Sequence, residues 1–302
     1  MGLVYALGAY LSWGLVVPVH FRLLSAFSPS HILAVRILWS CLFAVGLVLA
    51  WRRRVRSPFP LRPRHGLLVV SAGLIGVNWL LYLQAVNGGH LLDASLGYYI
   101  NPLISVALGA VVLGERLRPL QVAAVGVAAA GVGIAVGWAG AVPVVALALA
   151  VSFALYGLVR KIVGVDPLVG FLAETLILMP AAATWVALSP EPALPPDPRD
   201  FALLALTGVT TALPLIWFAA AAERLRLATL GLMQYLAPTC LLALSVLAYG
   251  EELAPHAVAM FGLIWLALAL YAFDLLRAGR RSPVEPGARP DAARIPRPLP
   301  RA

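Results

Sequence analysis

The chain has 302 residues, of which 62% are hydrophobic and 12% charged, and its mean hydropathy is +0.92. A water-soluble domain of this length would not tolerate so many apolar side chains on its surface, so the composition excludes a soluble globular protein. The formal net charge of +9 does not indicate a nucleic-acid partner, because the basic residues form short interruptions between apolar runs rather than a stripe on one face.

Ten apolar runs of about 20 residues follow one another along the chain, and a helix of about that length crosses roughly 30 Å of hydrocarbon. The sequence therefore predicts an all-α membrane protein with ten transmembrane helices. No basic segment precedes the first run, so we expect the first span to direct insertion without a cleaved signal peptide. The predicted spans cover residues 3–24, 31–51, 65–86, 91–113, 119–138, 141–160, 167–188, 200–222, 227–249 and 255–276.

Basic residues concentrate in alternate connections between these runs. The loop at 52–64 holds six arginines, and the segment 277–302 holds seven and is rich in proline. Placing both termini in the cytoplasm puts nineteen Lys and Arg residues on the cytoplasmic side and two on the other, as the positive-inside rule requires. We therefore expect a multi-pass protein of the cytoplasmic (inner) membrane with a disordered basic tail that lies near anionic lipid headgroups.

The fourth and ninth runs share one pattern. Pro102 and Glu115 are 13 residues apart, as are Pro238 and Glu251, and a glycine precedes each glutamate. The two motifs are 136 residues apart, which matches two halves of five runs each. Because five is odd, the halves would have opposite orientations, the inverted-repeat pattern of secondary transporters. The alternative is a chance match between two apolar helices.

This pattern divides the chain into two repeats and a tail. Inversion also predicts that Glu115 ends its span at the cytoplasmic face, whereas Glu251 ends its span outside. The predicted first repeat covers 3–138, the second covers 141–276, and the tail covers 277–302.

Charged side chains inside the spans are candidates for function, because a charge near the bilayer centre costs about 2.5–3.5 kcal/mol. Arg36 lies near the outer end of the second run, where it either faces a cavity or reaches the membrane surface. Glu174 lies near the cytoplasmic end of the seventh run and either contacts substrate, carries a proton or has a structural hydrogen-bonding role. Asp93 is a second proton-coupling candidate, and helix capping is its alternative.

Hydrogen-bonding and aromatic residues within the spans complete the predicted site. Asn101 directly precedes Pro102, whose missing N–H leaves a carbonyl free for a ligand or a side chain. Pro102, Pro214 and Pro238 are the predicted hinges or helix breaks. The residues expected to contact substrate are Trp13, Arg36, Asn78, Trp79, Tyr82, Gln84, Tyr98, Tyr99, Asn101, Tyr156, Glu174, Gln234 and Tyr235.

The sequence holds no catalytic or cofactor motif. Its five histidines are scattered, and no nucleophile elbow, zinc-protease motif or phosphate-binding loop occurs. Cys41 and Cys240 are far apart and lack metal-ligand spacing. We therefore expect no enzyme, no cofactor, no metal and no ATP-driven step.

Several blocks resemble a known family across nearly all of residues 3–276. They include ILAVRILWS, GVNWLLYLQAVNGGHLLDASLGYYINPLISVALGAVVLGERLRPLQ and FAAAAERLRLATLGLMQYLAPTCLLALSVLAYGEE. These blocks are similar to the RarD branch of the EamA family in the drug/metabolite transporter superfamily. The resemblance implies ten helices in two inverted repeats, both termini inside and a central cavity. It also implies a permease of the chloramphenicol-sensitivity or resistance type.

Together these observations predict a secondary transporter that exports a small metabolite or drug by alternating access around a cavity near the middle of the membrane. The expected partners are a small-molecule substrate and membrane lipids, and a homodimer is left open. The alternatives are a lipid or lipid-linked-sugar flippase and a non-transporting membrane subunit.

Overall fold

The computed structural model describes residues 1–51, 63–192 and 194–281 except 88–90, 140–143 and 251–254. Within these residues the regular elements are helices and no strand occurs, which confirms the all-α fold class. Predictions about the loop at 52–62, about Glu251 and about the tail beyond residue 281 lie outside the described residues.

The helices follow the predicted runs closely. By length and composition nine of the described helices are able to cross a membrane, and a tenth apolar helix, Ser95–Val111, is shorter. The elements are α1 (Gly2–Leu11), η1 (Ser12–Val16), α2 (Val17–Leu23), α3 (Pro29–Trp51), η2 (Pro63–Gly66), α4 (Leu67–Asn87), α5 (Leu91–Val111), α6 (Pro119–Ala139), α7 (Val144–Val163), α8 (Pro167–Leu188), α9 (Pro198–Arg224), α10 (Leu227–Met233), α11 (Leu236–Tyr249) and α12 (Pro255–Arg281).

Two spans are interrupted. In the first, α1 and α2 are joined by the π-helical turn η1, directly before Pro18, and a wider turn of this kind accommodates a proline that cannot donate a backbone hydrogen bond. In the ninth span, α10 and α11 are separated at Gln234 and Tyr235, just before Pro238. Pro102 and Pro214 lie inside the continuous helices α5 and α9.

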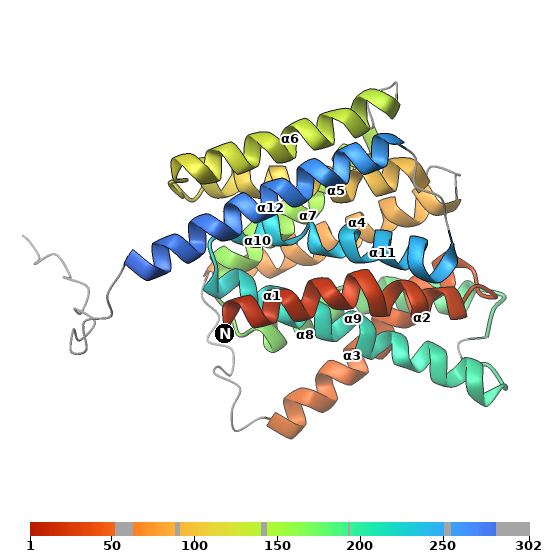
Figure 1. The fold of residues 1–302 in the computed structure, drawn as a ribbon. Coiled ribbons are helices and arrows are strands. Elements are labelled where there is room, and N and C mark those ends of the chain that lie inside the picture. The colour runs from red at the N-terminus through yellow and green to blue at the C-terminus, as the bar shows by residue number, and fades with distance from the viewer. Residues whose placement is uncertain (52–62, 88–90, 140–143, 193, 251–254, 282–302) are drawn as a thin grey trace, which may run out of the picture.

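The helices lie alongside one another as a bundle (Figure 1). Along one edge, α6 packs on α12; next to them, α5 packs on α7 and α10, and α7 also packs on α4. On the other side, α9 packs on α1 and α3, and α3 packs on α8. The N-terminus and the last described turns of α12 lie at the same end of the bundle, as an even number of spans requires.

Glycine permits the closest of these helix contacts. A Cβ added to Gly208 of α9 would lie 2.6 Å from the backbone carbonyl of Trp39 in α3. Because side chains cannot approach backbone so closely, only glycine allows this packing. By contrast, a Cβ at Gly46 of α3 would meet nothing within 4 Å.

We therefore predict opposite effects for two alanine substitutions. Gly208→Ala should lower the stability of the purified protein by about 1–3 kcal/mol, because the extra methyl forces α9 away from α3. Gly46→Ala should leave stability unchanged or raise it by up to about 1 kcal/mol, because alanine is the better helix former. Thermal unfolding in detergent measures both, and equal melting temperatures for the two variants would contradict the packing described.

Candidate functional site

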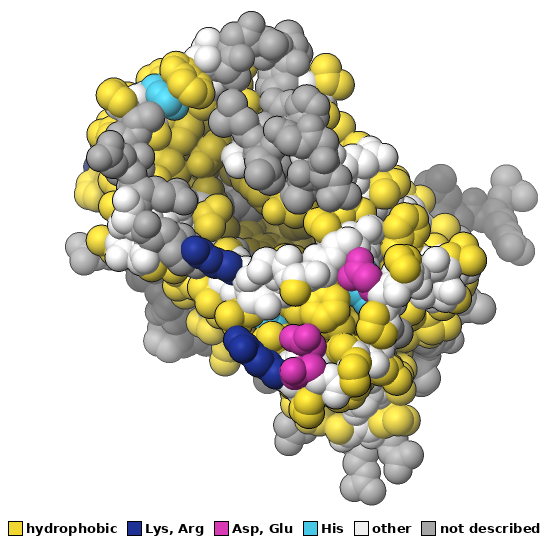
Figure 2. All heavy atoms as spheres, turned by 90° about the vertical axis from the view of Figure 1, so that its right-hand side faces the viewer, with side chains coloured by type: hydrophobic (Ala, Val, Ile, Leu, Met, Phe, Trp, Pro, Cys, Tyr) yellow, Lys and Arg dark blue, Asp and Glu magenta, His cyan; other side chains and the backbone are white. Residues whose placement is uncertain are grey.

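The end of the bundle opposite the N-terminus is hollowed. Figure 2 looks onto this end and shows a depression in the middle of the face with hydrophobic side chains on its walls. Helix α3 begins at this end, so Arg36, seven residues after Pro29, lies about two helical turns below it. The residues around Arg36 are therefore the first part of the candidate site.

An arginine–aromatic group surrounds this position. The guanidinium carbon of Arg36 lies 4.2 Å from the centroid of the Trp79 ring and 5.8 Å from that of Phe21, which is cation–π geometry. The rings of Tyr82 and Tyr98 meet edge to face at 6.3 Å, and Tyr82 lies about one helical turn after Trp79 on α4. The group thus joins α2, α3, α4 and α5, and four of its five members belong to the predicted substrate-binding set.

The charge of Arg36 is compensated by ring faces rather than by an acid. Its Nε atom is buried and has no hydrogen-bond partner within the described residues. Nor is an ion pair to Arg36 found in that part of the chain. Tyr82 and Tyr98 remain 36% and 52% exposed, so the group has accessible ring surface.

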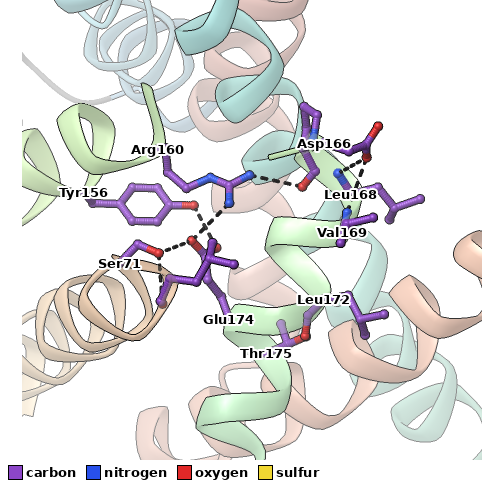
Figure 3. A network of polar contacts seen from close by, with 11 residues as sticks. Ser71, Tyr156, Arg160, Asp166, Leu168, Val169, Leu172, Glu174 and Thr175 are labelled. Carbon is purple, nitrogen blue, oxygen red and sulfur yellow. Dashed lines mark hydrogen bonds and ion pairs between the residues drawn. The ribbon is translucent and has the colours of Figure 1, made fainter. Parts of the chain in front are cut away.

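A second polar group lies toward the other end of the bundle and is buried. The Glu174 carboxylate accepts hydrogen bonds from Ser71 Oγ at 2.6 Å, from Tyr156 Oη at 3.2 Å and from Arg160 Nη1 at 3.4 Å (Figure 3). The Glu174 and Arg160 side chains are only 3% and 2% exposed. Arg160 also donates to the carbonyl of Pro167. We call Ser71, Tyr156, Arg160 and Glu174 the Glu174 network; it ties α4, α7 and α8 together.

Sequence reasoning identified only half of this network. Glu174 and Tyr156 were among the predicted substrate contacts, whereas Arg160 was counted only as a cytoplasmic loop charge and Ser71 was not considered. The available signal was a lone acid within a span, which needs a buried partner. Arg160 and Lys161, at the end of the preceding span, are the nearest basic residues in sequence.

Three further predicted residues lie in the packed centre. Asn78 donates to the carbonyl of Leu149 at 2.9 Å and to Ser152 Oγ at 3.0 Å, which joins α4 to α7. Asn101 is buried and accepts a hydrogen bond from Ser105 within the same helix. Trp13 packs at the edge of the Phe153 ring, with centroids 5.7 Å apart.

The ninth span contacts the fourth and the first. Tyr235 Oη donates to the carbonyl of Tyr99 at 3.1 Å, and these residues are 136 positions apart, the predicted repeat distance. Gln234 is buried at the break between α10 and α11, and Tyr10 Oη of α1 donates to the carbonyl of Leu230 in α10 at 2.9 Å. Gln84 is exposed, and the side chain of Asp93 lies outside the described residues. The predicted site therefore divides into separate groups.

Glu115 has a structural role that the repeat motif did not reveal. Its carboxylate accepts hydrogen bonds from the backbone N–H groups of Leu227 at 2.6 Å and Ala228 at 2.9 Å. It thereby caps the first turn of α10 from a different part of the chain, where free N–H groups favour a negative charge. This contact fixes the end of α5 against the start of α10.

Comparison with known proteins agrees with these observations. The model of the EamA-like transporter family matches residues 1–137 and again residues 141–273. An "Uncharacterized transporter" of Vibrio cholerae is 45% identical over 284 residues, covering 92% of this chain and 94% of the relative. "Protein RarD" of Escherichia coli is 42% identical, covering 93% and 97%. "Chloramphenicol-sensitive protein RarD" of Pseudomonas aeruginosa is 31% identical, covering 88% and 91%.

A solved structure supports the fold alone. It carries the name "Crystal structure of protein", covers 93% of this chain and 99% of its own, and superposes with a TM-score of 0.71 at 22% identity.

The buried Glu174–Arg160 pair generates a prediction about stability. Glu174→Gln should lower the free energy of unfolding by about 3–5 kcal/mol, because the buried guanidinium loses its counter-charge. The control is Glu223→Gln, which removes the acid of the more exposed Glu223–Arg224 pair and should cost about 0–1 kcal/mol. Thermal unfolding of the purified variants measures the difference. If both variants melt alike, the Glu174 network does not hold the three helices together.

Proposed function

The chain belongs to the EamA-like transporter family, and from this membership we propose that it is a secondary transporter that exports a small metabolite or drug across the inner membrane by alternating access. The observation that carries the proposal is the contrast between the two ends of the bundle. One end is hollowed, and toward the other end a buried polar network joins three helices. A carrier that opens to one side at a time requires this asymmetry.

The arrangement of the helices supports an inverted repeat. Exchanging the first five spans with the last five converts the α4–α7 contact into the α1–α9 contact. It likewise converts the α3–α9 contact into the α4–α8 contact, and all four contacts are present. The pairs α3–α8, α5–α10 and α6–α12 map onto themselves and also pack together. This pattern is expected of two copies of one five-helix unit related by a dyad in the membrane plane.

The orientation follows from the arginine distribution. With both termini in the cytoplasm, the hollow opens outward and the Glu174 network lies toward the cytoplasm. Around that end, Lys161 donates to the carbonyls of Ala222 and Leu225, and Glu115 caps α10. Opening toward the cytoplasm would require the Glu174 network to separate, so we propose that it is the cytoplasmic gate.

Glu174 is also the proposed site of proton coupling. Protonation of its carboxylate would remove the attraction to Arg160, and this would favour opening of the gate toward the cytoplasm. The hollow opens at an end of the bundle, which favours a water-soluble solute over a lipid. The name of the Pseudomonas aeruginosa relative suggests chloramphenicol as a first solute to test.

The orientation is tested with single cysteines. In a chain that carries Cys41→Ala and Cys240→Ala, Tyr98→Cys should react with a membrane-impermeant maleimide in intact cells, because Tyr98 is half exposed. Thr175→Cys, next to Glu174 and 1% exposed, is the matched control and should stay unlabelled. Mass-shift gels measure the extent of labelling. Labelling of Tyr98→Cys from the cytoplasmic side alone would reverse the proposed orientation.

Transport itself is tested in proteoliposomes with radiolabelled chloramphenicol. The wild-type protein should increase flux above that of protein-free liposomes, and Asn101→Ala should reduce this increase by about tenfold or more, as when an important solute contact is lost. Gly46→Ala, at an open helix surface, controls for reconstitution and should keep wild-type flux. Undiminished flux in Asn101→Ala would remove Asn101 from the site, and no flux in wild type would remove chloramphenicol as the solute.

A further inference from the structure

Arg36 differs from Arg118, Arg160 and Arg226 in having no acidic partner within the described residues. Arg160 pairs with Glu174, Arg118 with Asp274 and Arg226 with Glu115, at nitrogen–oxygen distances of 3.4, 2.5 and 4.0 Å. Arg36 lies inside a span that is expected to be surrounded by lipid, where an uncompensated charge is most costly. Its Nε nevertheless has no hydrogen-bond partner within the described residues.

The aromatic rings leave part of the guanidinium free to bind a ligand. Trp79 lies over it at 4.2 Å, and stacking on one face leaves the N–H groups at the edge of the planar group directed away from the ring. Those N–H groups form a fork whose spacing matches the two oxygens of a carboxylate. Within the described residues the site therefore has donors for an anion but no acidic side chain of its own.

The rings also provide a surface for the rest of a ligand. Tyr82 and Tyr98 are 36% and 52% exposed while they contact each other edge to face. Exposed aromatic faces next to a cation bind flat apolar groups by stacking, and the tyrosine hydroxyls add hydrogen-bond donors. A ligand that is anionic at one end and flat and apolar at the other would use all of these groups.

We infer that the solute recognised best is a monocarboxylate with a flat, aromatic body, whose carboxylate binds Arg36 and whose ring stacks against Trp79, Tyr82 and Tyr98. Chloramphenicol, which has no carboxylate, would bind through the rings alone. This inference rests on the proposed transport function and gives it a substrate class. A single guanidinium matches the single charge and the planar shape of a carboxylate. Binding would also supply the counter-charge that Arg36 lacks, so that closure of the outer end would no longer bury an unpaired cation.

Benzoate is the test probe, and benzamide is its neutral counterpart of nearly the same shape. Benzoate at about ten times its dissociation constant should raise the melting temperature of the purified full-length protein by about 2–4 °C, since a ligand that binds only the folded state stabilises it. Benzamide should give no comparable shift. Phenyl phosphate, added in parallel, distinguishes a preference for a phosphate from a preference for a carboxylate.

The variants assign the effect to Arg36. Arg36→Gln should abolish the benzoate shift, and Arg36→Lys should keep part of it because the charge remains but the fork is lost. Arg199→Gln, which removes an exposed arginine at the start of α9, should keep the full shift. Should Arg36→Gln fail to fold, Arg36→Lys still tests the assignment, because it keeps the charge: a full benzoate shift in Arg36→Lys would show that the guanidinium fork is not used.

The outcomes separate this inference from the proposed function. Equal shifts with benzoate and benzamide, a shift with phenyl phosphate alone, or a benzoate shift that persists in Arg36→Gln would each overturn the carboxylate assignment. Chloramphenicol flux that remains in wild type in any of those cases would leave the transport proposal standing. Benzoate binding that depends on Arg36, in a protein that moves neither benzoate nor chloramphenicol across proteoliposomes, would overturn transport and keep the binding site.

Discussion

Every polar group in these helices must find its partner within the protein, because hydrocarbon offers none. Most polar side chains of the described spans meet this requirement by hydrogen-bonding to one another or to backbone carbonyls, and Nε of Arg36 is an exception. Asn78 binds a carbonyl of α7, Tyr235 binds a carbonyl of α5, and Lys161 binds carbonyls at the end of α9. These bonds help to determine which helices are neighbours, because an apolar helix surface gains little by exchanging contacts with lipid for contacts with another helix.

The same requirement explains why the two ends of the bundle differ. The Glu174 network encloses its charges completely, and a buried pair of this kind is costly to open unless one of its charges is removed. The arginine–aromatic group holds a charge with ring faces alone, which is weaker and leaves room for another molecule. The Glu174 network stabilises the closed state of its end of the bundle, whereas the charge of Arg36 has no acidic partner within the described residues. An anion bound at Arg36 would therefore lower the free energy of that end without directly affecting the Glu174 network.

The sequence predicted the spans well because twenty apolar residues leave little choice of structure, whereas it predicted the site only in part. Arg36, Trp79, Tyr82 and Tyr98 were chosen separately as polar or aromatic residues within spans, and the structure brings them together. Arg160 was missed because a basic residue at the end of a span usually indicates the cytoplasmic boundary. Only the packing of α7 on α4 and the hydrogen bonds from α7 to Glu174 of α8 show that its side chain turns inward. The Glu115 cap was missed for a similar reason, since its partner is more than a hundred residues away.

Arg36 and Glu174 lie at similar positions in the two halves of the chain that the EamA-like family model matches, although their surroundings differ. Pro29 and Pro167 begin α3 and α8, and Arg36 and Glu174 each lie seven residues further on. At the repeat distance of 136, Ser71 corresponds to Thr207, and the two hydroxyls lie within hydrogen-bond distance of the carbonyls of Leu68 and Leu204, which also correspond. Tyr156 corresponds to His20, which hydrogen-bonds with Thr210 instead of with a charged group. At the hollowed end, a base therefore stands where the Glu174 network has its acid. An end built on Arg36 cannot close by copying the Glu174–Arg160 pair, and in the mechanism that we propose the solute supplies the negative charge.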